Sequence, residues 1–220
     1  PLSVLPMLID PDLFLQFTGG GVMDFIWVAP MVGAAIALYR RHFLWSALLF
    51  GVAAGTKQQP WLLAPFLMLY VWNTDQHQSI RGRLRACSSY GGAAAASFLV
   101  LNGPFIALDP AAWFEGTMLP FTRQLVPFGS GLSMLTQTGI ADLPKGFYSL
   151  ATFGVWGVLL LAYALYFRTL KHTLWLMPAI IMWFGYRSLQ NYFIYWTPLL
   201  MMAAFAWWED DREATAGELT

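Results

Sequence analysis

Four of the twelve Lys and Arg residues in this 220-residue chain stand apart from the others by position: Lys57, Arg123, Lys145 and Arg187. Lys57 lies between two apolar runs, in the stretch 51–61. A cation at the end of a membrane helix is expensive unless a partner compensates its charge. A phosphate group is such a partner, because lysine binds it as a point charge and arginine through two parallel hydrogen bonds. These residue types therefore predict binding of a phosphorylated ligand.

Each of these cations also has a plainer explanation. Lys57 can extend to the membrane surface or pair with an aspartate. Arg187 can anchor a helix end in the interface, and Arg123 and Lys145 can be solvated loop charges. Asn191 and Tyr192, close after Arg187, are able to hydrogen-bond a sugar or a phosphate, or else belong to an aromatic belt.

The composition is that of a membrane protein. Residues of the hydrophobic class make up 58% of the chain and charged residues 11%, whereas soluble domains carry about 25% charged residues. The net charge is zero, which excludes a basic surface for nucleic acid. One cysteine, Cys87, excludes an internal disulfide. The three histidines are scattered along the chain, so no metal site is predicted.

Apolar runs predict an all-α fold, a polytopic bundle of transmembrane helices. We expect about seven spans within residues 1–208, part of another span at 1–9, and a polar tail at 209–220. The expected spans are 22–39, 43–56, 60–72, 88–108, 150–167, 174–186 and 192–208. The chain begins at Pro1, without methionine, and we expect it to lack an N-terminal part.

Basic residues in alternate loops set the expected orientation, because cytoplasmic loops are enriched in Lys and Arg. The other side then receives the 56–59 turn and a long outer loop, 102–149. A bacterial plasma membrane is expected from the short loops and from the absence of glycosylation sites. The cytoplasmic set, which places the C-terminus in the cytoplasm, is Arg40, Arg41, Arg81, Arg83, Arg85, Arg168, Lys171 and Arg212.

The pair of helices around Lys57 is short. Fourteen residues at 43–56 reach about 21 Å, whereas the hydrocarbon core is about 30 Å thick. The turn at Lys57 should therefore stop inside a cleft that is open to the outside. Gly51 and Gly55 are spaced to let helices approach closely, and Gly91 and Gly92 are expected to do the same.

The outer loop has its own expected structure. Asp109 can cap a short helix that begins at Pro110, a residue favoured at the first helical position. The large apolar residues that follow should lie on the membrane interface. This expected set is Trp113, Phe114, Leu119 and Phe121.

Several short motifs together resemble the GT-C superfamily of membrane glycosyltransferases. A helix of small residues, a lysine near the turn and an apolar helix with Pro65 occupy 43–70. The stretches 6–10 and 14–17 resemble a segment of the eukaryotic glucosyltransferases that extend the lipid-linked N-glycan precursor, and Lys57-Gln58 is similar to their Lys-Gln pair. The run 187–193, followed by Pro198, resembles the last outer turn and final helix of many bacterial members.

This resemblance implies a hexosyl- or pentosyltransferase that uses a polyprenyl- or dolichyl-phosphate sugar. Its acceptor would be a glycan, a lipid or a protein. Lys57, Arg187 and Arg123 would bind the donor phosphate. Gln58, Asn191 and Tyr192 would bind substrate.

The catalytic base of the family lies in a first outer loop, which we expect to precede this chain. The resemblance places Asp10 and Asp12 at a second acidic position, which supports acceptor or metal binding. The simpler explanation is turn formation around Pro11. No cofactor is assigned, and the need for a divalent metal stays open. A secondary transporter or flippase, and a non-catalytic membrane subunit, remain the alternative functions.

Overall fold

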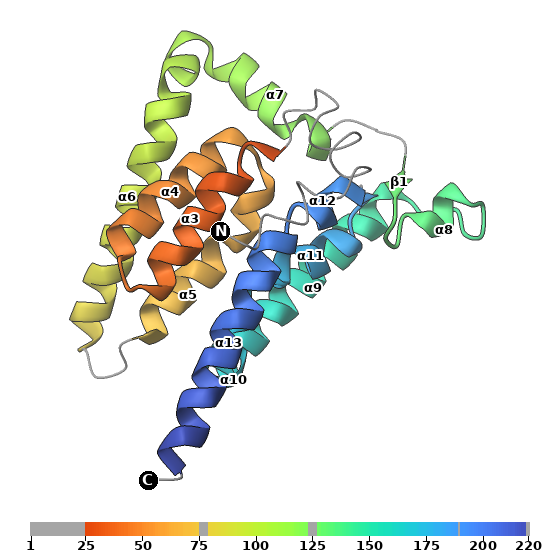
Figure 1. Cartoon of the computed structure of the whole chain (residues 1–220). Coiled ribbons are helices and arrows are strands. Elements are labelled where there is room, and N and C mark those ends of the chain that lie inside the picture. The colour runs from red at the N-terminus through yellow and green to blue at the C-terminus, as the bar shows by residue number, and fades with distance from the viewer. Residues whose placement is uncertain (1–24, 75–78, 123–126, 189, 219–220) are drawn as a thin grey trace.

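The computed structural model of the chain describes residues 25–74, 79–122, 127–188 and 190–218. These residues are almost all helical, which confirms the all-α class (Figure 1). The first group of elements is α3 (Val28–Tyr39), α4 (Phe43–Thr56), η4 (Gln59–Leu63), α5 (Ala64–Thr74), α6 (Ile80–Leu108) and α7 (Pro110–Thr122). The second is β1 (Phe128–Gly129), α8 (Met134–Gln137), α9 (Lys145–Leu165), α10 (Phe167–Leu170), η5 (Lys171–Trp175), α11 (Met177–Trp183), β2 (Arg187–Ser188), α12 (Gln190–Ile194) and α13 (Thr197–Glu218).

The long helices run up and down between two ends of the molecule (Figure 1). Helix α4 packs between α3 and α6, and α5 packs on α6. Helices α9, α11 and α13 form a second group beside these, and α7 crosses at one end (Figure 1). The connection between α3 and α4, the end of α5, the start of α6 and the helix α10 lie at the opposite end, where α13 also ends (Figure 1).

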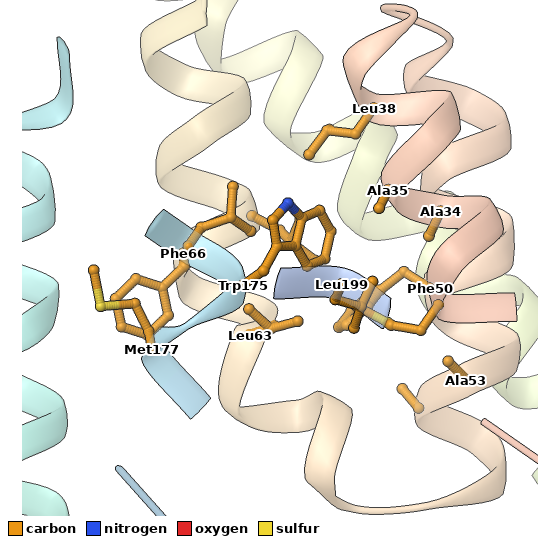
Figure 2. Packing of buried hydrophobic residues seen from close by; sticks show 14 of the residues in the cluster. Ala34, Ala35, Leu38, Phe50, Ala53, Leu63, Phe66, Trp175, Met177 and Leu199 are labelled. Carbon is orange, nitrogen blue, oxygen red and sulfur yellow. The ribbon is translucent and has the colours of Figure 1, made fainter. Parts of the chain in front are cut away.

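The core joins the two helix groups around Trp175. Figure 2 shows this indole with Leu63 and Phe66 of the η4–α5 segment and with the small residues Ala34 and Ala35 of α3. Trp175, Leu63, Phe66, Ala34 and Ala35 are all 0% exposed. The Nε1 of Trp175 donates a hydrogen bond of 2.9 Å to the hydroxyl of Tyr39, so the buried indole N–H is satisfied.

Close packing of α4 against α6 depends on small residues, as predicted for Gly51 and Gly55. A Cβ added to Gly51 would overlap the carbonyl of Ala94 and the hydroxyl of Ser97. Ser97 Oγ also donates to Leu48 O of α4 at 2.8 Å. The absence of a side chain thus lets the two backbones approach closely enough for a direct hydrogen bond between helices.

The same prediction is wrong for Gly92. This glycine is exposed, and a Cβ there would meet nothing within 4 Å. A Cβ at Gly91 would make only an ordinary contact of 3.8 Å with Met68. Gly91 therefore faces α5 rather than α4, and Gly92 lies on the side of the helix opposite to Ala94.

Two helices of the described residues, α6 and α9, are long and apolar enough to cross a bilayer. Only 6% of the most apolar window of α6 and 11% of that of α9 are buried in the protein. Large side chains on α9 such as Leu150, Val158 and Leu165 are exposed. Helices α3 and α4 are apolar but shorter. The seven-span arrangement therefore stays a prediction, although two of its spans reach the required length.

Several predicted helix ends differ from the observed ones. Helix α6 begins at Ile80 rather than at residue 88, because Ser79 caps it by accepting a hydrogen bond of 3.2 Å from Gly82 N. The expected span 174–186 is divided between η5 and α11, and α13 continues to Glu218 through the polar tail. The charged residues at the start of α6 and near the end of α13 were predicted to lie outside the helices, although each group belongs to a continuous helix.

Candidate functional site

Lys57 lies directly after the last residue of α4 and is half-buried. Its backbone is extended, with φ −154° and ψ 154°, and its N–H makes the last bond of the helix, to Ala53 O at 3.2 Å. A cation near a helix C-terminus is favoured by the unpaired carbonyl groups there. The position predicted for the Lys57 turn, between two short helical segments, is confirmed.

Gln58 connects this turn to α7. Its Nε2 donates to the carbonyl of Thr117 at 3.1 Å. Close by, Trp61 Nε1 donates back to Ala54 O at 2.8 Å, which closes the turn on itself. One donor of the predicted substrate-binding amide of Gln58 is therefore used within the protein.

Asn102 makes a second connection between α4 and α7. Its Nδ2 donates to Gly55 O at 3.0 Å and to Phe98 O at 3.3 Å. Its Oδ1 accepts a hydrogen bond of 3.1 Å from Trp113 Nε1. Trp113 is half-buried and Phe114 is 58% exposed, and their position on the membrane interface stays a prediction.

The start of α7 and its junction with α6 shape an open pocket. Asp109 Oδ1 accepts from Ala112 N at 2.9 Å, so the predicted cap of the helix beginning at Pro110 is confirmed. The pocket has a volume of about 440 Å³ and lies inside the bend between the two helices. Its lining is mostly apolar with one carboxylate, and consists of Phe105, Leu108, Asp109, Ala112, Trp113, Gly116 and Thr117.

Arg187 is held by a short strand pair. Strands β1 and β2 are parallel, with Phe128 opposite Arg187 and Gly129 opposite Ser188. Ser130 N adds a hydrogen bond to Ser188 O at 2.8 Å. The backbone of Arg187 is thus fixed on both sides of the residue, while its side chain is exposed.

Ser188 organises the segment that follows β1. Its buried hydroxyl accepts a bond of 2.9 Å from Gly131 N and lies 3.1 Å from the hydroxyl of Ser133. A Cβ on Gly129 or Gly131 would overlap atoms of Ser188 or the carbonyl of Trp183. Only glycine therefore allows the segment after β1 to lie this close to the turn of Arg187.

Lys57 and Arg187 lie at the same end of the molecule. The segment η4, which follows Lys57, packs against α4 and against α11, the helix that leads to Arg187. Figure 1 shows α7, β1 and α12 at this end as well. The cations of the loops at 40–41 and 168–171 belong to the opposite end (Figure 1).

The structure describes only some of the other predicted site residues. Tyr192 is half-buried against the core in α12. Asn191 lies in the same helix, with its side chain outside the described part of the structure. Arg123, Asp10 and Asp12 lie outside the described residues altogether.

Three residues that the sequence did not single out contribute to this end of the molecule: Asn102, Thr117 and Ser188. Asn102 offered the clearest signal, because a lone amide inside an otherwise apolar helix needs partners. Thr117 contributes only its carbonyl, and Ser188 acts through a strand pair between distant segments. Neither contact has a local sequence pattern.

No protein family, curated protein or solved structure compared with the chain matches it. The function is therefore argued from the residues of this chain and from their positions. Any function has to explain three features: a turn with a half-buried lysine, an arginine at the same end of the molecule, and an open pocket at the junction of α6 and α7.

Proposed function

We propose that the chain is an integral membrane glycosyltransferase of GT-C type. It moves a hexose or pentose from a polyprenyl-phosphate carrier to a glycan, lipid or protein acceptor at the non-cytoplasmic face. The observation that carries this proposal is Lys57, half-buried at the end of a 14-residue helix and at the same end of the molecule as Arg187. Cations at one end of a bundle of apolar helices suit the phosphate of a membrane-embedded lipid.

The orientation follows from the distribution of basic residues. Arg40, Arg41, Arg81 and Arg168 are exposed at the end opposite Lys57. Cytoplasmic loops are enriched in such residues. In the proposed arrangement about seven spans cross the membrane, and the surfaces of α6 and α9 face lipid. The C-terminus lies in the cytoplasm of a bacterial cell.

The proposed reaction is a displacement at the anomeric carbon of the donor sugar. The acceptor hydroxyl oxygen forms the new bond to this carbon, and the bond between the carbon and the phosphate oxygen breaks. A carboxylate takes the hydroxyl proton, with Asp10 and Asp12 as the candidates within this chain. Lys57 and Arg187, with Arg123, stabilise the negative charge that builds on the leaving phosphate.

The test uses the full-length protein in nanodiscs with a radiolabelled polyprenyl-phosphate sugar. Binding and transfer are compared for the unchanged protein, Lys57→Ala and Arg187→Ala, after each is shown to fold. Arg168→Ala is the matched control, because Arg168 is an exposed cation at the opposite end. Loss in the first two variants alone supports the proposal. Equal activity in all four proteins refutes the assignment of the cations.

A secondary transporter or flippase is the second candidate, and one observation favours it. The 3₁₀ segment η4 interrupts the helical run two residues after Lys57, and transporters bind their substrates at broken helices. Proteoliposomes that move a polyprenyl-phosphate sugar across the bilayer without transferring the sugar would favour this function over the glycosyltransferase.

A further inference from the structure

One side-chain amide, that of Asn102, touches three helices. It belongs to α6, donates to Gly55 O of α4 at 3.0 Å, and accepts from Trp113 Nε1 of α7 at 3.1 Å. A further bond of 3.3 Å returns to Phe98 O in its own helix. The donor and the acceptor of the amide are thus both used, which an apolar side chain at this position would not allow.

Gly55 makes room for this contact. A Cβ added to Gly55 would lie 3.0 Å from Asn102 Nδ2, a distance that would force the amide to shift. The ring of Phe98 packs edge-on against both Trp61 and Trp113, with centroids 6.3 Å apart in each pair. The aromatic contacts thus join α6 to α7 and to η4, while the amide joins α6 to α7 and to α4.

Helix α7 is attached at two points that flank Lys57 in sequence. Asn102 connects Gly55 to Trp113, and Gln58 connects the other side of Lys57 to Thr117. Trp113 and Thr117 are four residues apart, so both lie on one face of α7. Hydrogen bonds therefore connect the Lys57 turn to α7 on both sides of the lysine in the sequence.

We propose that Asn102 is a positioning residue that makes α7 and the Lys57 turn move as one unit. It acts through Gly55 and Trp113, and it touches no reacting group itself. This inference rests on the function proposed above in so far as the turn presents Lys57 to a donor phosphate. Ordering the turn before the ligand arrives lowers the entropy that binding has to offset.

The variants separate the two halves of the amide. Asn102→Leu removes both the donor and the acceptor, whereas Asn102→Asp keeps an acceptor for Trp113 and removes the donor to Gly55 O. Trp113→Phe removes only the indole donor. This variant still tests the contact if the Asn102 variants fail to fold. Asn73→Leu is the matched control, because Asn73 donates within its own helix, to Leu69 O at 2.9 Å, and to no other helix of the described residues.

Hydrogen–deuterium exchange of the full-length protein in nanodiscs is the first measurement. Asn102→Leu and Trp113→Phe should speed exchange in both α7 and residues 56–60, and Asn73→Leu should not. Faster exchange in α7 alone, with residues 56–60 unchanged in both variants, would overturn the inference.

Binding of a sugar-free polyprenyl phosphate supplies a readout that a purely structural role would not change. Asn102→Leu should raise the Kd about ten-fold when Lys57 is present and should have no further effect in the Lys57→Ala background. An equal rise in both backgrounds would contradict a role through Lys57. If the unchanged protein binds no polyprenyl phosphate, the proposed function fails, and the exchange experiment alone still decides whether Asn102 couples α7 to the turn.

Discussion

At the scale of single residues, the two cations should differ in what they tolerate. A lysine acts on phosphate as a point charge, whereas an arginine offers two parallel donors. Lys57→Arg should therefore keep most of the transfer activity, while Arg187→Lys should lower kcat/KM by about ten-fold, the loss expected for one charge-assisted hydrogen bond. Steady-state transfer assays check this. Equal tolerance at both positions would contradict the different roles given to them.

Glycine positions offer a second prediction at this scale. Gly51→Ala should destabilise the protein by about 1–3 kcal/mol, because the new methyl group overlaps Ala94 and Ser97 of α6. Gly92→Ala, in an exposed part of a helix with nothing within 4 Å, should be neutral or stabilising by up to about 1 kcal/mol. Thermal unfolding in detergent measures both. A stable Gly51→Ala variant would mean that α4 and α6 are not packed as closely as described.

At the scale of elements, the strand pair β1–β2 should control the position of Arg187. Gly131→Ala would drive a methyl group into the carbonyl of Trp183 and the hydroxyl of Ser188, so the segment after β1 has to move. We expect transfer to fall about as far as in Arg187→Ala, with a stability loss of about 1–3 kcal/mol.

Gly146→Ala is the matched control for this element, since a Cβ at Gly146 meets nothing within 4 Å. Transfer assays and thermal unfolding are run on both variants. Normal transfer by a folded Gly131→Ala protein would show that the strand pair does not position Arg187.

Elements with local signals could be predicted from the sequence, and those made by distant contacts could not. The bounds of α4, 43–56, were predicted as observed because an apolar run ends at Thr56. The cap at Asp109 was predicted because it depends on three neighbouring residues. The bond of Trp113 to Asn102 was not predicted, because the two residues belong to different helices. The pairing of Ser188 with Gly131 joins segments 57 residues apart and has no pattern in either.

At the scale of the whole molecule, the membrane orientation can be tested through the cysteine content. Cys87 is the only cysteine, so a protein with Cys87→Ala contains no other thiol that could react with the label. We expect Ser130→Cys to react with a membrane-impermeant maleimide added outside cells, and Arg168→Cys to react only after the membrane is opened. Ser130 and Arg168 lie at opposite ends of the molecule (Figure 1).

The reverse labelling pattern would invert the orientation and place Lys57 on the cytoplasmic side. Labelling of both positions from outside would contradict a membrane lying between the two ends. The exposed apolar surfaces of α6 and α9 give the physical reason for the expected pattern, because contiguous apolar surface of this kind is stable against lipid rather than water.

The central claim is that the end of the molecule with Lys57 binds a lipid-linked phosphate. The most direct measurement is the Kd of a sugar-free polyprenyl phosphate for the unchanged protein, Lys57→Ala and Arg168→Ala in nanodiscs. We predict that Lys57→Ala raises the Kd about 10- to 100-fold, the value of a charge-assisted contact, and that Arg168→Ala leaves it unchanged. An unchanged Kd in Lys57→Ala, or an equal rise in both variants, would contradict the account.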